Sequence, residues 1–233
     1  ELASWARIAL EAIPGSASDA ALRKAMSRLQ GNLLVGTINS IGVRRDAKAV
    51  NELCKKLDDP DPSVVSAAAV ALGRISGTKA ARALEQSLVR GPAGTRPAVA
   101  EGCILCAERL MLCGQTAQAA KLYDAVRAAA VPKQRILEAT RGAILARQSG
   151  GLPLLIEQLR SPDKACFGIG LRTARELPGL PVTEALAAEL DRCSPARQPL
   201  LLLAVADRSD EAASAAVLRA AKNGSKDVRR VAI

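Results

Sequence analysis

Apolar residues recur at helical spacing on both sides of a turn in the segment 50–75. Between Val50 and Leu57 they fall at i, i+3, i+4 and i+7, the stripe of an amphipathic helix. A second stripe follows in residues 65–75. Between the two, Asp61 can cap the second helix with its carboxylate, and Pro62 suits the first helical position. The segment therefore predicts a helix, a tight turn and an antiparallel helix.

The same two-helix pattern recurs along the chain with some drift in its period. Gly42 and Gly73 mark corresponding points of two second helices, 31 positions apart. We expect the last clear second helix to open at Ser194-Pro195 and to be bent at Pro199. The other expected helices span residues 32–43, 98–112, 116–129, 133–147, 152–159 and 164–177.

Helix pairs that recur every 30–40 residues cannot each bury an apolar face alone, so they stack into an α-solenoid. The run of small residues from Ala67 to Ala71 would let neighbouring helices approach closely. No segment alternates with period two, so no strands are expected. The fold prediction is an all-α, right-handed solenoid of about seven antiparallel helix pairs, forming one domain over 1–233. Both ends fall within the pattern, which suggests a fragment of a longer chain.

Residues 57–75, with their Asp-Pro-Asp-Pro and Ala-Leu-Gly-x-Ile elements, resemble a HEAT repeat of the short type also found in phycobilin lyases. Asp227-Val228-Arg229 is similar to the start of a final repeat. The segments 5–14 and 39–50 are similar to HEAT regions of large multidomain bacterial proteins. Several of those proteins also carry a keto-disaccharide-hydrolase-type module, which the resemblance places outside these residues.

Composition argues against ordinary hydrolytic chemistry. The 233 residues include no histidine, which removes the commonest general base and the Ser-His and Cys-His pairs. No phosphate-binding glycine loop is present. We therefore expect neither enzymatic activity nor a cofactor. Thirty-three basic residues against 23 acidic ones give a net charge of +10, which favours an acidic partner, but the excess is spread over both halves of the chain.

Arginines recur near the ends of the expected second helices. In solenoids these helices commonly line a concave face, where arginines can hold carboxylates or phosphates. The alternative is structural, because a cation in the last helical turn is favoured by the helix dipole without any ligand. The candidate binding residues are Arg44, Arg45, Arg74, Arg109, Arg147, Arg175 and Arg208.

Cys103 and Cys106 have the only spacing that suggests metal or redox chemistry. Zinc requires four ligands, and the chain offers no second Cys-x-x-Cys and no histidine, so we expect two buried, metal-free thiols. The acidic groups at 58–61 and 207–211 lie in turns between helices, where capping is the expected role. No apolar run approaches the length of a membrane span.

Two function classes remain. The first is a non-catalytic scaffold that presents a concave surface to a protein partner or to a neighbouring domain of its own chain. The second is a nucleic-acid-binding solenoid, which would explain the positive charge but lacks the aromatic residues that stack on bases, since Trp5, Tyr123 and Phe167 are the only aromatics. We favour the scaffold. A mixed or apolar surface on the second helices would support it, whereas an acid-free basic groove would support nucleic acid.

Overall fold

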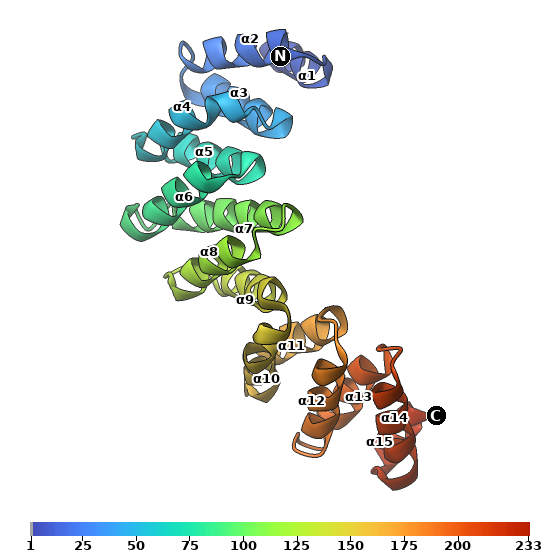
Figure 1. Cartoon of the computed structure of the whole chain (residues 1–233). Helices are drawn as coiled ribbons and strands as arrows, with labels where there is room; N and C mark the ends of the chain where they lie inside the picture. Colours follow the sequence, from blue (N-terminus) through green and yellow to red (C-terminus); the bar gives the residue numbers. More distant parts are fainter. Residues whose placement is uncertain (1) are drawn as a thin grey trace. The chain divides into compact units, whose positions relative to one another are not determined.

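The computed structural model describes residues 2–233, and helices make up about 80% of the chain. Fifteen α-helices and three short 3-10 helices follow one another in the described range, without any strand (Figure 1). This confirms the prediction of an all-α solenoid fold built from helix pairs. Contacts divide the chain into a first unit up to Gly142 and a second unit from Ala143 to Ile233.

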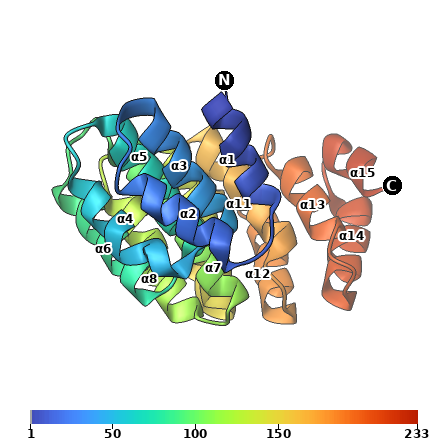
Figure 2. The same cartoon turned by 90° about the horizontal axis from the view of Figure 1, so that it is seen from above.

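The first unit consists of one helix, α1, followed by successive helix pairs. In the pairs α2/α3, α4/α5 and α6/α7, the second helices pack on one another to form one layer, and the first helices form the other (Figures 1 and 2). The bounds are α1 (Leu2–Ala12), α2 (Ser16–Met26), α3 (Gly31–Arg44), α4 (Val50–Lys55), α5 (Pro62–Ile75), α6 (Thr78–Arg90), α7 (Arg96–Leu112), α8 (Thr116–Ala128) and α9 (Lys133–Arg147), with 3-10 turns at Ala47–Ala49 and Lys56–Asp58.

The turn between α4 and α5 forms as its sequence predicts. Pro62 occupies the first turn of α5, and the Asp61 carboxylate accepts a hydrogen bond from the Ser63 backbone N–H at 2.8 Å. The cap satisfies one of the backbone donors that a helix N-terminus leaves unpaired. Both parts of the predicted helix start are confirmed.

Small residues bring α3, α5 and α7 into close contact. A Cβ added to Gly42 would lie 2.8 Å from the Cα of Ala71, and one added to Gly73 would lie 2.4 Å from the carbonyl oxygen of Gly102. Side chains at these glycines would force the helices apart. The alanines of α5 from Ala67 to Ala69, together with Ala71, are buried, so the predicted role of small residues is confirmed.

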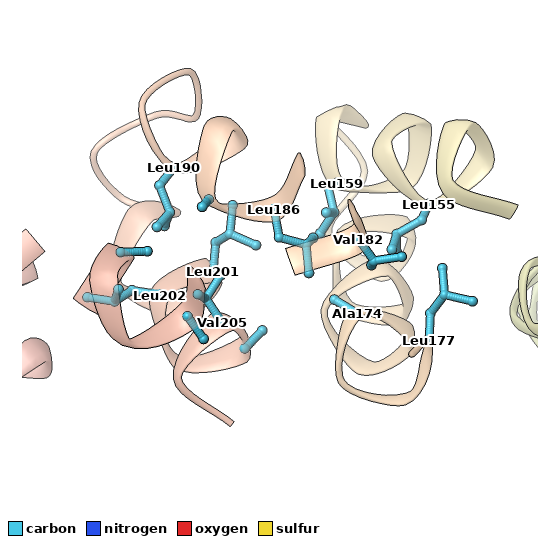
Figure 3. Close-up of a cluster of buried hydrophobic side chains, with 14 of the residues drawn as sticks. Leu155, Leu159, Ala174, Leu177, Val182, Leu186, Leu190, Leu201, Leu202 and Val205 are labelled. Carbon is cyan, nitrogen blue, oxygen red and sulfur yellow. The ribbon is translucent and has the colours of Figure 1, made fainter. Parts of the chain in front are cut away.

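The second unit contains the end of α9 and three further helix pairs. Its core is a continuous cluster of aliphatic side chains that includes Leu155, Leu177, Leu186 and Leu201 (Figure 3). The helices are α10 (Leu152–Arg160), α11 (Lys164–Glu176), α12 (Leu180–Leu190), α13 (Gln198–Ala206), α14 (Glu211–Asn223) and α15 (Lys226–Ala232), with a 3-10 turn at Gln148–Gly151.

The helix start expected at Ser194-Pro195 is wrong by about one turn. Residues 194–197 form a hydrogen-bonded turn, in which the Ser194 carbonyl accepts from the backbone N–H groups of Arg197 and Gln198, and α13 begins at Gln198. Pro199 therefore lies in the first turn of α13, where its missing N–H would have had no partner in any case. Proline at this position is compatible with a regular helix.

Candidate functional site

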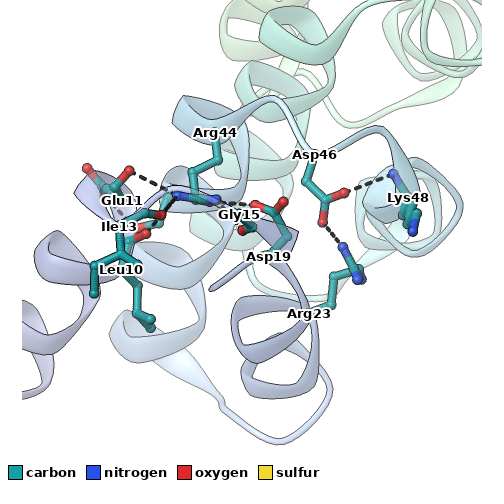
Figure 4. Close-up of polar contacts among 10 residues, drawn as sticks. Leu10, Glu11, Ile13, Gly15, Asp19, Arg23, Arg44, Asp46 and Lys48 are labelled. Carbon is teal, nitrogen blue, oxygen red and sulfur yellow. Dashed lines mark hydrogen bonds and ion pairs between the residues drawn. The ribbon is translucent and has the colours of Figure 1, made fainter. Parts of the chain in front are cut away.

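Arg44, the last residue of α3, is bound to the end of α1 (Figure 4). Its Nη1 donates to the carbonyls of Leu10 at 2.8 Å and Ile13 at 2.7 Å, and its Nη2 donates to the carbonyl of Gly15 at 3.0 Å. Its Nε pairs with the Asp19 carboxylate. The last carbonyls of a helix have no partner within it, so this guanidinium closes the C-terminus of α1.

Arg208 binds the C-terminal end of α11 in the second unit in the same way. Its Nη1 donates to the carbonyls of Ala174 and Leu177, its Nη2 to that of Gly179, and its Nε to the hydroxyl oxygen of Thr183. The residue is only 9% exposed, and burial lowers the pKa of its guanidinium. Arg44 and Arg208 are therefore both engaged within the fold by carbonyls at the end of an earlier helix, and a ligand-binding role for them stays a prediction.

Three of the remaining candidate arginines lie in the first unit. Arg45 is exposed. As the C-cap residue that directly follows α3, it has a left-handed backbone with φ of 55°. Arg74 in α5 and Arg109 in α7 are half-buried. Within residues 2–233, the buried Nε of Arg109 has no hydrogen-bond partner. A ligand-binding role for these three stays a prediction.

The last two candidates, Arg147 and Arg175, lie in the second unit and make contacts within it. Arg147 donates to the Ala143 carbonyl, one turn earlier in its own helix, at 2.9 Å. Arg175 is exposed, pairs through its Nε with the Asp207 carboxylate, and donates to the carbonyl of Leu171. These contacts leave both side chains at the surface, and a ligand-binding role for them also stays a prediction.

Acidic side chains lie among the arginines of the second helices α7 and α9. Arg135 pairs with Glu101 at 2.6 Å and with Glu138 at 2.8 Å. Glu108 lies near Arg141, and its pKa is raised mainly by partial burial, an effect that Arg141 opposes. These acids were not among the residues expected to bind a ligand. The seven-residue spacing of Glu101 and Glu108, which places both on one helix face, was the available signal.

Cys103 and Cys106 are both completely buried, as predicted. Burial raises the pKa of each thiol, so both are protonated near neutral pH. Cys106 also lies 3.5 Å from the hydroxyl of Ser76. Among the described residues, no group of three or more histidine, cysteine, aspartate or glutamate side chains is arranged to hold a metal ion.

Several acids of the inter-helix turns are bound to nearby groups. Asp59 accepts from Lys56 at 2.9 Å, and this hydrogen bond is the main cause of its lowered pKa. Asp210 caps α14 by accepting from the Ala213 N–H at 2.9 Å. The capping interpretation is therefore confirmed for Asp61 and Asp210. Separately, no helix within residues 2–233 combines the length and the apolarity that a membrane crossing requires.

One comparison with known protein families indicates a helical repeat. A family model described as HEAT repeats matches residues 20–103. The complex of CpcE and CpcF of phycocyanin lyase from Nostoc sp. PCC7120 is similar with 21% identity and a TM-score of 0.47, over 93% of this chain and 85% of that chain. Human deoxyhypusine hydroxylase in complex with glycerol is similar with 19% identity and a TM-score of 0.42, over 97% of this chain and 86% of that chain. The comparison with curated proteins gave no significant match. The family match supports HEAT-like helical repeats from α2 into α7.

Proposed function

We propose that this chain is a non-catalytic protein-binding or scaffolding domain. It presents the second-helix face of the first unit, formed by α3, α5, α7 and α9, to a protein partner or to a neighbouring domain of its own polypeptide. The observation that carries the proposal is the mixed charge of the part of this face that α7 and α9 form. Glu101, Glu108 and Glu138 lie among Arg135 and Arg141, with ion pairs as short as 2.6 Å.

Such a face suits protein better than nucleic acid. A nucleic-acid groove neutralises phosphates with an unbroken basic surface, and interleaved carboxylates repel phosphates. We therefore expect only weak, salt-sensitive DNA binding, with a Kd on the order of 10⁻⁴–10⁻⁶ M at physiological salt. Fluorescence anisotropy with a random duplex at low and physiological salt measures it. Tight binding that persists at physiological salt would replace the scaffold with the nucleic-acid alternative.

Affinity capture tests the protein-binding face directly. The wild-type chain and a Glu101→Lys/Glu108→Lys variant are used as baits in nuclease-treated lysate of the source cells, and captured proteins are identified by mass spectrometry. Glu184→Lys, an exposed charge reversal on α12 in the second unit, is the matched control. A specific partner should be retained by wild type and Glu184→Lys and lost by the double variant. A partner captured equally by all three would argue against this face.

The proposal also includes the absence of turnover by this chain alone. It rests on the lack of histidine and on the engagement of the turn acids in caps and ion pairs. The link to multidomain bacterial proteins with a keto-disaccharide-hydrolase-type module stays a prediction from the sequence resemblance. Any such activity would come from residues outside this chain.

A further inference from the structure

Two grooves of the first unit lie on either side of the turn at residues 59–61. Groove A, of about 680 Å³, lies between the α2–α3 turn and the α4–α5 turn. Groove B, of about 580 Å³, lies between the α4–α5 turn and the α6–α7 turn. Asp59 and Pro60 line both grooves and form the wall between them.

The two grooves are the same feature repeated once along the chain. For every residue that lines groove A except Gln30, the residue 31 positions later lines groove B. Met26 and Leu34 on the floor of groove A correspond in this way to Leu57 and Val65 in groove B. Because 31 residues is also the offset between Gly42 and Gly73, the grooves follow from the stacking of the repeats.

Charge alternates along the edge that the grooves share. Arg28 lies at the outer side of groove A, Asp59 on the shared wall and Arg90 at the outer side of groove B, at successive 31-residue intervals. Asp59 also pairs with Lys56, which lines groove A. Arg28 and Arg90 are exposed. Asp58, also exposed, adds a second carboxylate beside the wall. A complementary ligand carries negative, positive and negative charge in that order, with an apolar group between each pair.

The distance between successive repeats indicates which backbone conformation such a ligand has. Stacked helices lie about 8–10 Å apart. A polyproline II segment advances about 9.3 Å per three-residue turn, so every third side chain points the same way. Its period therefore matches the repeat period, with one row of side chains entering the grooves and a second row facing the alternating charges.

We propose that grooves A and B together bind an extended peptide segment of a partner protein, with the pattern acidic, apolar, x, basic, apolar, x, acidic. The two apolar side chains fill the grooves, the basic side chain lies over the exposed Asp58, beside the pair of Asp59 with Lys56, and the acidic ones pair with Arg28 and Arg90. This site deepens the proposed function and rests on it. It lies on the edge of the inter-helix turns and is distinct from the second-helix face.

The test uses a fluorescent peptide, Glu-Leu-Pro-Lys-Leu-Pro-Glu, and its charge-swapped counterpart, Lys-Leu-Pro-Glu-Leu-Pro-Lys. Wild-type protein should bind the first at least about fivefold more tightly in anisotropy titrations, because the swapped peptide sets like charges opposite each other. The Arg28→Glu/Asp58→Lys/Arg90→Glu variant should reverse this preference. Equal affinity for the two peptides, or no binding of the first, would overturn the proposal.

Groove filling separates this site from non-specific charge attraction. Gln86→Trp places a large side chain in groove B from an exposed position on α6 and should weaken the first peptide by about tenfold. Glu85→Trp, at an adjacent exposed position that does not line the groove, is the matched control and should bind like wild type. Equal loss in both variants would contradict the site. The peptide tests can fail while Glu101→Lys/Glu108→Lys still loses its captured partner. That combination would contradict the groove site but not the proposed function.

Discussion

Arg44 and Arg208 make matching contacts with the end of the helix that precedes their own helix pair. Each donates to the backbone carbonyls of the residues 34, 31 and 29 positions earlier and to a side-chain oxygen 25 positions earlier. Arg44 also donates to the Glu11 carbonyl at 3.1 Å. In both cases the guanidinium closes the end of one helix and joins it to the next pair. The match shows that one contact pattern recurs in both units.

A third turn of this type has no arginine at the corresponding position. Gly15, Gly77 and Gly179 precede α2, α6 and α12 with φ of 101°, 101° and 113°, values that disfavour residues with a Cβ. Arg44 and Arg208 follow Gly15 and Gly179 by 29 positions, and the residue 29 positions after Gly77 is Cys106. There the Ser76 hydroxyl donates to the Cys106 carbonyl at 3.1 Å. Here a hydrogen bond from a serine hydroxyl to a backbone carbonyl joins the turn to α7, in place of the bonds that an arginine makes in the other two turns.

We expect Arg208→Met to destabilise the second unit by about 2–4 kcal/mol, because it leaves three carbonyls and the Thr183 hydroxyl without their donor. Urea unfolding followed by circular dichroism measures the change. Arg175→Met removes an exposed ion pair and should cost about 1 kcal/mol or less. Similar losses in the two variants would show that Arg208 is not a structural contact of this strength.

Arg44→Met should loosen the attachment of α1 to α3 while the rest of the first unit keeps its stability. Hydrogen exchange followed by mass spectrometry should show faster exchange in residues 2–15, because the guanidinium that binds their carbonyls is gone. Exchange in α5 should not change. Unchanged exchange in α1 would mean that other contacts hold the helix.

Gly73→Ala should destabilise the first unit by about 1–3 kcal/mol, since the new Cβ would meet the Gly102 carbonyl oxygen at 2.4 Å. Gly168→Ala is the matched control in a helix. Its Cβ would meet nothing within 4 Å, so it should stabilise α11 by about 0.5–1 kcal/mol through the lower entropy of the unfolded chain. Thermal unfolding of both variants measures the two changes in stability, which should have opposite signs. An unchanged stability in Gly73→Ala would contradict the close helix contact.

The buried Glu189 carboxylate should make stability depend on pH. Its hydrogen bond from Arg160 is the main cause of a pKa below the ordinary 4.5. The folded pKa is lower than the unfolded one, so this contribution is fully present above about pH 4.5 and is lost as pH falls through the folded value. Urea titrations between pH 7 and pH 3 should show less acid sensitivity in Glu189→Gln. An identical pH profile in both proteins would contradict this.

The cysteines should differ sharply in reactivity. Cys113 is exposed, whereas Cys103 and Cys106 are buried with raised pKa values. An aromatic disulfide reagent should therefore modify Cys113 quickly in the native protein and reach the buried pair only on unfolding. Mass spectrometry of digested, labelled protein identifies the sites. Stoichiometric zinc in protein purified without chelator would contradict the prediction of a metal-free pair.

Most helices and the main turn are predictable from the sequence because these features are local. The Asp61 cap, Pro62 and the apolar stripes act within a few residues of one another, and the structure confirms them. The start of α13 was misplaced because Ser194-Pro195 satisfies local capping rules equally well in a turn. The arginines were recognised at helix ends, but whether each faces a ligand or a carbonyl depends on the preceding helix pair.

The sequence by itself therefore determined the all-α repeat and its period, because periodicity and capping are short-range properties of the chain. Only the tertiary structure decided what the repeat places together. Arg44 and Arg208 donate to carbonyls about 30 residues earlier in the chain. Glu101 on α7 forms an ion pair with Arg135 on α9. Arg28, Asp59 and Arg90 lie along one edge of the first unit. These relationships depend on how successive helix pairs stack, and stacking is set by the close approach of small residues such as Gly73 and Gly102, which are far apart in the chain.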